Sequence, residues 1–155
     1  MVNSIYNLDE ILTDWCTNVI KRIRENLDST GTTASGKTKE SLDFELTDYG
    51  VIITARPFAK GVETGRPAGK IPYNMTDIIS KWIVDKGLES HFHIETHSQL
   101  RSVAYLIGQK IKREGTELYR NGGRDDIFTN VVDEEVENLY DLIFHEVAVE
   151  INNQL

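Results

Sequence analysis

Residues 31–38 are the segment whose types and spacing most directly suggest chemistry. The run from Gly31 to Thr38, GTTASGKT, matches the phosphate-loop pattern G-x-x-x-x-G-K-[ST]. In that pattern backbone amides and the lysine bind phosphates, and the hydroxyl binds magnesium. Such a loop must follow a buried strand and begin a helix, whereas this run follows a charged amphipathic segment and precedes a predicted strand after a few residues. We therefore favour a flexible loop, and a small P-loop nucleotide-binding enzyme using this run is the alternative.

Histidine and cysteine side chains offer two further candidates. On a strand, His91 and His93 would share a face, and a turn could bring His97 and Glu95 to them. Their spacing matches no metal motif such as H-E-x-x-H, so an exposed polar segment is favoured. Cys16 is the only cysteine and lies within a predicted helix, which favours a structural role over a nucleophilic one. The sequence thus predicts no catalytic residues, no metal and no cofactor.

Hydrophobic periodicity predicts the elements that carry these residues. A helix is expected from about Ile5 to Leu27, because one apolar stripe recurs at intervals of three and four residues: Leu8, Leu12, Trp15, Val19, Ile23 and Leu27. A short helical turn is expected at 35–40. Alternation over 42–46 and a β-branched run at 51–54 predict a hairpin with a turn at 47–50.

The second half of the chain predicts mainly helices. A short helix is expected over 58–63 and an exposed loop over 65–72, which holds two prolines and two glycines. A helix capped by Asn74, with Asp77 completing a capping box, should place Trp82 in the core and stop at Gly87. Two more are predicted. One is capped by Ser98, runs to Arg113 and ends at Gly115. The other spans 133–151 and has an apolar stripe of five residues: Val136, Leu139, Ile143, Val147 and Ile151. The acidic residues 133–135 would then lie in the first turn of the last helix, where they complement its dipole.

The predicted fold class is therefore α+β. It comprises an N-terminal helix, a β-hairpin completed by a further strand or a neighbouring subunit, and three further helices. The extra strand or subunit is expected because a lone hairpin is marginal in water and leaves unpaired edges. The length of 155 residues predicts a single domain, 1–155. No apolar run approaches the roughly 20 residues of a membrane span and no secretory signal is visible, so an intracellular or particle-assembled protein is expected.

Charge is strongly segregated along the chain. The formal net charge is −8, which disfavours a protein that wraps nucleic acid. Residues 125–155 hold nine acids and no Lys or Arg, whereas residues 56–70 hold four bases and one acid and residues 101–124 hold six bases and two acids. The acidic end and the basic middle could pair within a chain or between neighbours. A solvated acidic helix face is the simpler alternative.

An ordered series of segments resembles the neck or tail-completion proteins of tailed bacteriophages, also described as head–tail joining or minor tail proteins. The first, GKTKESL at 36–42, is similar to the family's G-x-L-x-x-S-I. The hairpin then leads into RPFAKGVETGR at 56–66, where the family has Pro-Tyr-Ala, Val-Glu-Tyr/Phe-Gly and a basic residue. IP at 71–72, WI at 82–83, AYLIGQKI at 104–111 and REGT at 113–116 follow in the family's order, and DIF at 126–128 stands before the last helix. Gly108 and Gln109 depart from the family's usual Ala and Arg.

The resemblance implies a structural virion protein rather than an enzyme. It implies an α+β subunit that forms a homo-oligomeric ring in the neck, assembled in the host cytoplasm without a membrane. Portal or head-closure proteins and tail proteins would be the partners, and DNA would pass through the lumen without sequence-specific binding. A soluble adaptor outside the virion is a further alternative.

A basic segment and its flanks are the predicted subunit interface. Two glycines and two prolines suit the loop to a projecting arm that would meet the acidic surface of the next subunit. The residues assigned to the interface by this hypothesis are Arg56, Phe58, Lys60, Glu63, Arg66, Lys70 and Ile71.

Overall fold

The computed structural model describes residues 8–154, which divide into two compact units. The first comprises the described parts of Met1–Thr30, Thr38–Arg56 and Asp125–Leu155, and the second comprises Gly31–Lys37 and Pro57–Arg124. Each unit is considered by itself, and the single domain expected over 1–155 stays a prediction. The expected helix start at residues 5–7 lies outside the described residues.

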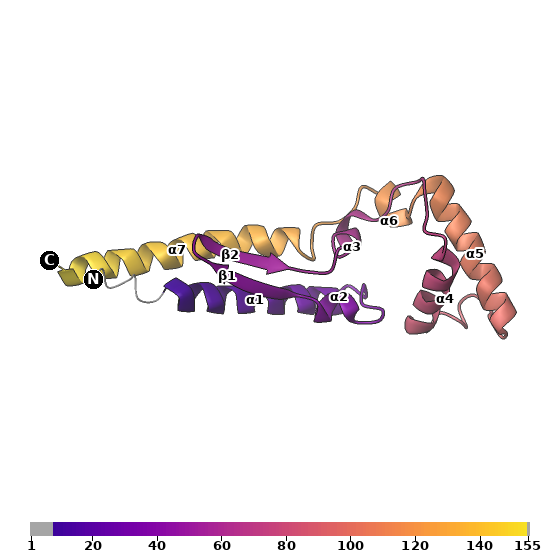
Figure 1. Ribbon diagram of the computed structural model, residues 1–155, viewed down its shortest axis with the longest axis horizontal. Helices are drawn as coiled ribbons and strands as arrows, with labels where there is room; N and C mark the ends of the chain where they lie inside the picture. The colour runs from indigo at the N-terminus through magenta and orange to yellow at the C-terminus, as the bar shows by residue number, and fades with distance from the viewer. Residues whose placement is uncertain (1–7, 155) are drawn as a thin grey trace. The chain divides into compact units, whose positions relative to one another are not determined.

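The α+β class is confirmed, with helices and one antiparallel hairpin in the described residues (Figure 1). The elements are α1 (Leu8–Ser29), α2 (Lys37–Glu40), β1 (Asp43–Thr47), β2 (Gly50–Thr54), α3 (Gly61–Thr64), α4 (Met75–Asp85), α5 (His97–Glu114), α6 (Glu117–Arg120) and α7 (Thr129–Gln154). None of the helices within residues 8–154 is long and apolar enough to cross a bilayer.

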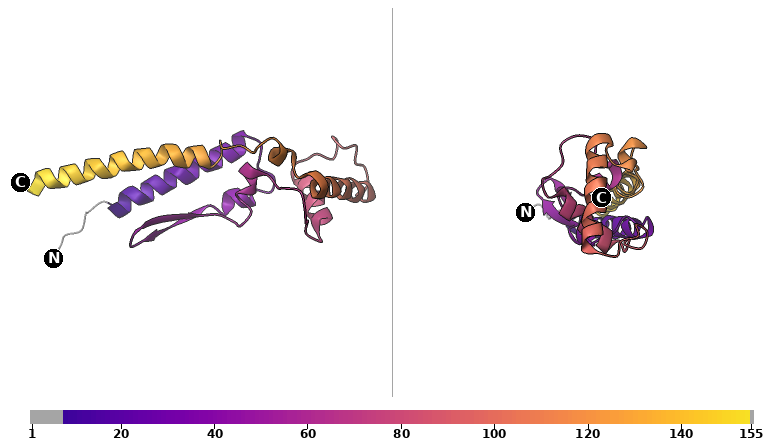
Figure 2. Two further views of the ribbon diagram at one scale, coloured as in Figure 1. Left: turned by 90° about the horizontal axis from the view of Figure 1, so that it is seen from above. Right: turned by 90° about the vertical axis from the view of Figure 1, so that its right-hand side faces the viewer.

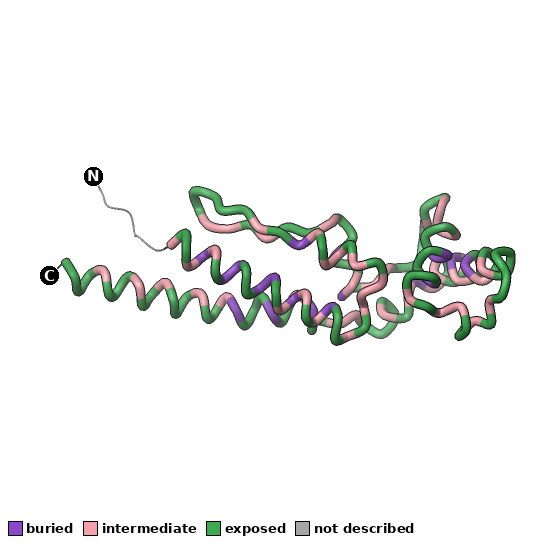
Figure 3. Tube along the Cα trace, turned by 90° about the horizontal axis from the view of Figure 1, so that it is seen from below, coloured by how far each residue is buried: buried purple, intermediate pink, exposed green. Residues whose placement is uncertain are grey.

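The core of the first unit lies between α1 and α7, which run side by side (Figures 1 and 2). The predicted stripe of α1 is buried from Leu12 to Leu27, because those side chains share the face that α7 covers. Ile127 and Val131 complete this core from the start of α7 and the turn before it. Figure 3 shows buried residues on α1 and on the first part of α7, whereas the rest of α7 is only exposed or intermediate.

A buried carboxylate connects the two long helices. Glu135 is 6% exposed, and its side chain accepts hydrogen bonds from Arg22 at 2.5 Å and Asn18 at 3.1 Å. Trp15 donates its indole N–H to the backbone carbonyl of Glu135 at 2.6 Å. Arg22 also bonds Glu134 at 2.6 Å, and the hydrogen bonds to Glu134 and Glu135 raise the pKa of its guanidinium. The network fixes the side chains of α1 against α7.

This network corrects the role predicted for residues 133–135. Helix α7 begins at Thr129, and no acidic residue lies in its first turn. The acids therefore lie in the second turn, beyond the reach of the unpaired amides at the helix start. Two of them, Glu134 and Glu135, bind α1 instead.

The hairpin confirms the predicted alternation and packs on α1. Phe44 pairs with Ile53 and Leu46 with Val51, so these four apolar side chains share one face, with Glu45 and Ile52 on the other. Leu46 is nevertheless 37% exposed, and the other three are only half-buried. Within the described residues the sheet has two strands, so completion by a neighbouring subunit stays a prediction.

The second unit is built on the pair α4 and α5. Ile79, Ile83 and Ala104 form its buried centre, and half-buried apolar side chains surround them. Thr96, rather than Ser98, is the N-cap of α5: its hydroxyl accepts from the backbone N–H of Gln99, and the Gln99 side chain accepts from the Thr96 N–H in a capping box. Asn74 is the N-cap of α4 but makes no side-chain cap hydrogen bond, so the capping box predicted there is wrong.

The core position predicted for Trp82 is also wrong. Its side chain is 41% exposed, while Ile79 and Ile83 are buried. Among the helices that the structure describes, α4 makes its main contact with α5, so the side of α4 centred on these isoleucines is the covered one. The apolar stripe predicted from the sequence was wider than the contact, and Trp82 lies at its margin.

Candidate functional site

The loop after α3, predicted as a projecting arm, is anchored at its first half. The Arg66 N–H donates to the Thr116 hydroxyl, and the Thr116 N–H donates back to the Arg66 carbonyl, both at 2.9 Å. The Gly69 N–H donates to the Lys112 carbonyl at 2.8 Å, and the Arg66 guanidinium donates to the Lys70 carbonyl at 2.7 Å. Residues 66–69 therefore lie along the end of α5 rather than projecting freely.

Two glycines permit this close approach. A Cβ at Gly115 would lie 2.8 Å from the Arg66 carbonyl oxygen, and one at Gly65 would lie 2.5 Å from the Tyr119 backbone nitrogen. Both glycines also have positive φ, +78° and +67°. The glycines of the VETGR and REGT segments thus let two backbones touch.

The predicted interface residues fall in both units. Arg56 belongs to the first unit, and the other six belong to the second. Phe58 is 76% exposed, and Lys60 and Lys70 are also exposed, so these side chains are available to a partner. Glu63 is 7% exposed and offers little surface. The assignment of this set to a subunit interface stays a prediction.

Bases of the second basic segment make ion pairs within their own unit. Arg101 bonds Asp77 at 2.7 Å, and Glu114 accepts from Arg113 at 2.6 Å and Arg120 at 2.8 Å. The hydrogen bond from Arg113 is the main cause that lowers the pKa of Glu114 below its ordinary value. These bases are therefore partly neutralised before any partner binds.

The segment that matches the phosphate loop lies in a different setting from that motif. It follows helix α1, and its lysine begins α2, a helix of four residues, Lys37–Glu40. A phosphate loop requires a preceding buried strand and a following helix whose amides point at the phosphates. Residues 31–38 instead follow a helix rather than a strand, and the helix that they lead into has only four residues.

The histidines and the cysteine form no reactive cluster in the described part of the chain. No group of three or more His, Cys, Asp or Glu side chains among residues 8–154 could hold a metal ion. His91 lies edge-on to Phe92 at 4.9 Å. Cys16 is fully buried in α1, and this burial raises the pKa of its thiol.

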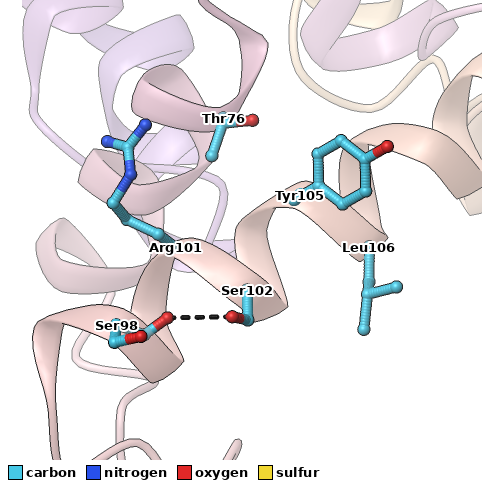
Figure 4. Close-up of a pocket in the computed structure, with 6 residues that line it drawn as sticks. All are labelled: Thr76, Ser98, Arg101, Ser102, Tyr105 and Leu106. Atoms are coloured by element: carbon cyan, nitrogen blue, oxygen red, sulfur yellow. Dashed lines mark hydrogen bonds between the residues drawn. The ribbon is translucent and has the colours of Figure 1, made fainter.

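A shallow hollow of about 550 Å³ lies along α5 and the start of α4 (Figure 4). The Ser102 hydroxyl donates to the Ser98 backbone carbonyl at 3.0 Å, so its proton is held within α5. The lining side chains in Figure 4 spread along the helices rather than converging on one point: Thr76, Ser98, Arg101, Ser102, Tyr105 and Leu106. Among these six side chains no hydroxyl is hydrogen-bonded to a side-chain base, the contact that activates a nucleophile in covalent catalysis.

An apolar groove of about 720 Å³ is formed by α4, α5 and α6 of the second unit. Ile78 and Trp82 of α4 and Ile107 and Ile111 of α5 line it, with Leu118 of α6. Ile78 is 47% exposed, so the apolar lining is open to solvent. The exposed edge of Trp82 is thus part of a concave apolar surface, which suits binding of an apolar side chain.

The second half of α7 carries an exposed apolar surface that the sequence did not predict. Tyr140, Phe144, Val147 and Ile151 recur at intervals of four, three and four residues, and all are exposed, Phe144 at 80% and Tyr140 at 68%. We name these four residues the α7 stripe. Val147 and Ile151 belong to the apolar periodicity that predicts this helix, but periodicity identifies an apolar face and not the neighbour that covers it. One feature of the sequence could have predicted this exposed surface: Leu142 and Val149 lie on the other side of the helix. A helix that is apolar on several sides needs several partners to cover it.

Comparisons with known proteins identify no relative. No family model matches the chain, and neither the curated proteins nor the solved structures include a detectable match.

Proposed function

We propose that this chain is a structural subunit of a tailed-bacteriophage virion, in which copies form a homo-oligomeric ring in the neck that joins head to tail. The observation that carries the proposal is the uncovered apolar surface of the first unit. The α7 stripe is exposed along three turns, and the hairpin of the described chain has no third strand. Contiguous apolar surface of this kind is typical of proteins that bury it on assembly.

The order of the segments supports the neck as the place of assembly. The segments between 36 and 128 follow the order found in tail-completion proteins, and two of their glycines, Gly65 and Gly115, hold the loop of one segment against the helix end of another. This gives a structural reason for the joint presence of VETG and REGT. The proposed role is structural and includes no catalytic step.

Partners and charge fit the same proposal. Portal or head-closure proteins would bind one side of the ring and tail proteins the other, with DNA in the lumen. The net charge of −8 would keep the phosphate backbone from adhering while DNA moves. The chain would thus be located in the virion and bind no specific DNA sequence.

The basic segment remains the proposed contact between subunits. Phe58 supplies apolar surface and Lys60 and Lys70 supply charge, and all three are exposed. Because an exposed ion pair contributes only about 0–1 kcal/mol, burial of Phe58 must supply much of the stability of the contact.

Assembly in the absence of this chain tests the proposal. We expect DNA-filled heads and free tails to accumulate separately on a density gradient, and wild-type chain to restore joining. A Lys60→Glu, Lys70→Glu variant should restore it poorly while its circular dichroism spectrum stays unchanged, and Lys21→Glu, on an exposed face of α1, should restore it fully. Complete infectious particles formed without the chain would contradict the proposal.

A further inference from the structure

Two surfaces of this chain have complementary shape and charge, and they lie on different units. The α7 stripe is a convex apolar ridge on the first unit. The groove between α4, α5 and α6 is a concave apolar surface on the second. We infer that the α7 stripe of one copy docks into the α4–α5–α6 groove of a second copy.

Shape supports this pairing. The stripe follows the i, i+4, i+7, i+11 spacing of helices that lay one apolar face into a groove, and it extends over about 17 Å of helix. Its two largest side chains, Tyr140 and Phe144, are the most exposed of the four. In the groove, the side chains of Ile78 and Trp82 are about half exposed, so they can contact these two aromatic rings.

Charge selects this occupant over other helices of the chain. Residues 125–155 contain nine acids and no Lys or Arg, and on a helix Glu137 and Asp141 lie beside the stripe. The groove is lined by Lys110 and Arg120, against one acid, Glu117. Arg120 already pairs with Glu114 at 2.8 Å, so Lys110 is the base that this argument depends on. Lys110 makes no ion pair within 4.0 Å with any residue that the structure describes, although its charge helps to lower the pKa of Glu114, and its ammonium group can still pair with an acidic helix.

The contact would be heterologous, because two different surfaces meet. Each copy would then offer one free stripe and one free groove, and such contacts build closed rings or open filaments. This inference rests on the proposed self-assembly and specifies the surfaces that carry it.

Sedimentation equilibrium of the full chain tests the contact. A stripe variant, Phe144→Gln with Val147→Gln, and a groove variant, Ile78→Gln with Trp82→Gln, should each weaken self-association by at least about tenfold. The matched control is Leu142→Gln with Val149→Gln, which changes two exposed apolar residues on the opposite side of α7 and should alter association by less than about threefold. Lys110→Glu should weaken association, whereas Lys112→Glu, on the same helix but outside the groove, should not.

Mixing the variants determines the geometry. The stripe variant keeps an intact groove and the groove variant keeps an intact stripe, so an equimolar mixture should form a dimer and nothing larger. The mixture would not regain association if stripes packed against each other or if the stripe docked within its own chain, and either result overturns the inference.

The wild-type chain provides a second test. If it stays monomeric at about 100 μM the inference is overturned, since even a weak specific contact has a dissociation constant near that range. If all variants assemble as the wild type does, the proposed docking contact is wrong but the proposed neck ring is not affected. If the chain self-associates through the stripe and the groove but heads and tails join without it, the neck function alone is wrong.

Discussion

At the scale of single residues, the buried side chain of Glu135 connects two long helices. Its carboxylate is shielded from water and accepts hydrogen bonds from Arg22, Asn18 and Asn138. We expect Glu135→Ala to lower the free energy of unfolding by about 1.5–3 kcal/mol, because hydrogen bonds to charged groups are lost and their donors are left unsatisfied. Urea unfolding followed by circular dichroism measures the change.

Glu134 provides the matched control. It bonds the same guanidinium, but its side chain is 62% exposed. Glu134→Ala should therefore cost only about 0–1 kcal/mol, the range of exposed ion pairs. If both variants lost the same free energy of unfolding, burial of the Glu135 side chain would contribute nothing to stability.

Glu114 gives a prediction about pH. The hydrogen bond from Arg113 lowers its pKa in the folded state. A carboxyl whose pKa is lower in the folded than in the unfolded state stabilises the fold above the unfolded pKa, and this contribution is lost as the pH falls through the folded pKa. Carbon-13 NMR titration of the Glu114 carboxyl should therefore give a pKa below the ordinary glutamate value.

Removal of each arginine identifies the cause of that shift. Arg113→Ala should return the pKa of Glu114 most of the way to its ordinary value. Arg120→Ala should raise it less, since the Arg120 charge is a smaller cause. If Arg120→Ala raised the pKa of Glu114 more than Arg113→Ala did, Arg120 of α6 would be the main cause of the lowered pKa.

At the scale of elements, the contact between the loop at 66–69 and the end of α5 depends on Gly115. We expect Gly115→Ala to lower the free energy of unfolding of the second unit by about 1–3 kcal/mol or more, because a Cβ would meet the Arg66 carbonyl and the backbone has φ of +78°. Gly122→Ala is the control, since Gly122 also has positive φ but nothing lies within 4 Å of its added Cβ. Similar losses in both variants would show that backbone strain alone matters. Thermal unfolding followed by circular dichroism makes the comparison.

The loop between α1 and α2 gives a second prediction at this scale. It precedes a four-residue helix rather than the long helix that phosphate binding requires, so we expect no heat on titration with ATP and magnesium. Lys37→Ala should leave stability and assembly nearly unchanged. Micromolar binding that disappears in Lys37→Ala would restore the nucleotide-binding alternative.

At the scale of the whole molecule, the two compact units predict separate responses to mutation. Glu135→Ala should speed amide hydrogen exchange in α1 and α7, and Gly115→Ala should speed it in α4 and α5. In the double variant the two effects should add, because the sites share no partner. Loss of protection throughout the chain in either single variant would instead show one cooperative unit.

The sequence by itself determined the features that depend on neighbouring residues. The buried face of α1 follows from its period, the hairpin register from alternation around the turn after Thr47, and the end of α5 from Gly115. These are local regularities, since each is set by residues within a few positions along the chain.

The tertiary structure decided which apolar faces are covered and which polar groups meet. Periodicity predicted Trp82 as core and placed Val147 on the apolar stripe of the last helix, yet both side chains are exposed, because their helices are covered on fewer sides than are apolar. Glu135 was interpreted as a helix-end charge, yet it lies against Arg22, 113 positions away. Coverage depends on which helices pack together, and that is fixed by contacts between distant segments, which no local pattern specifies.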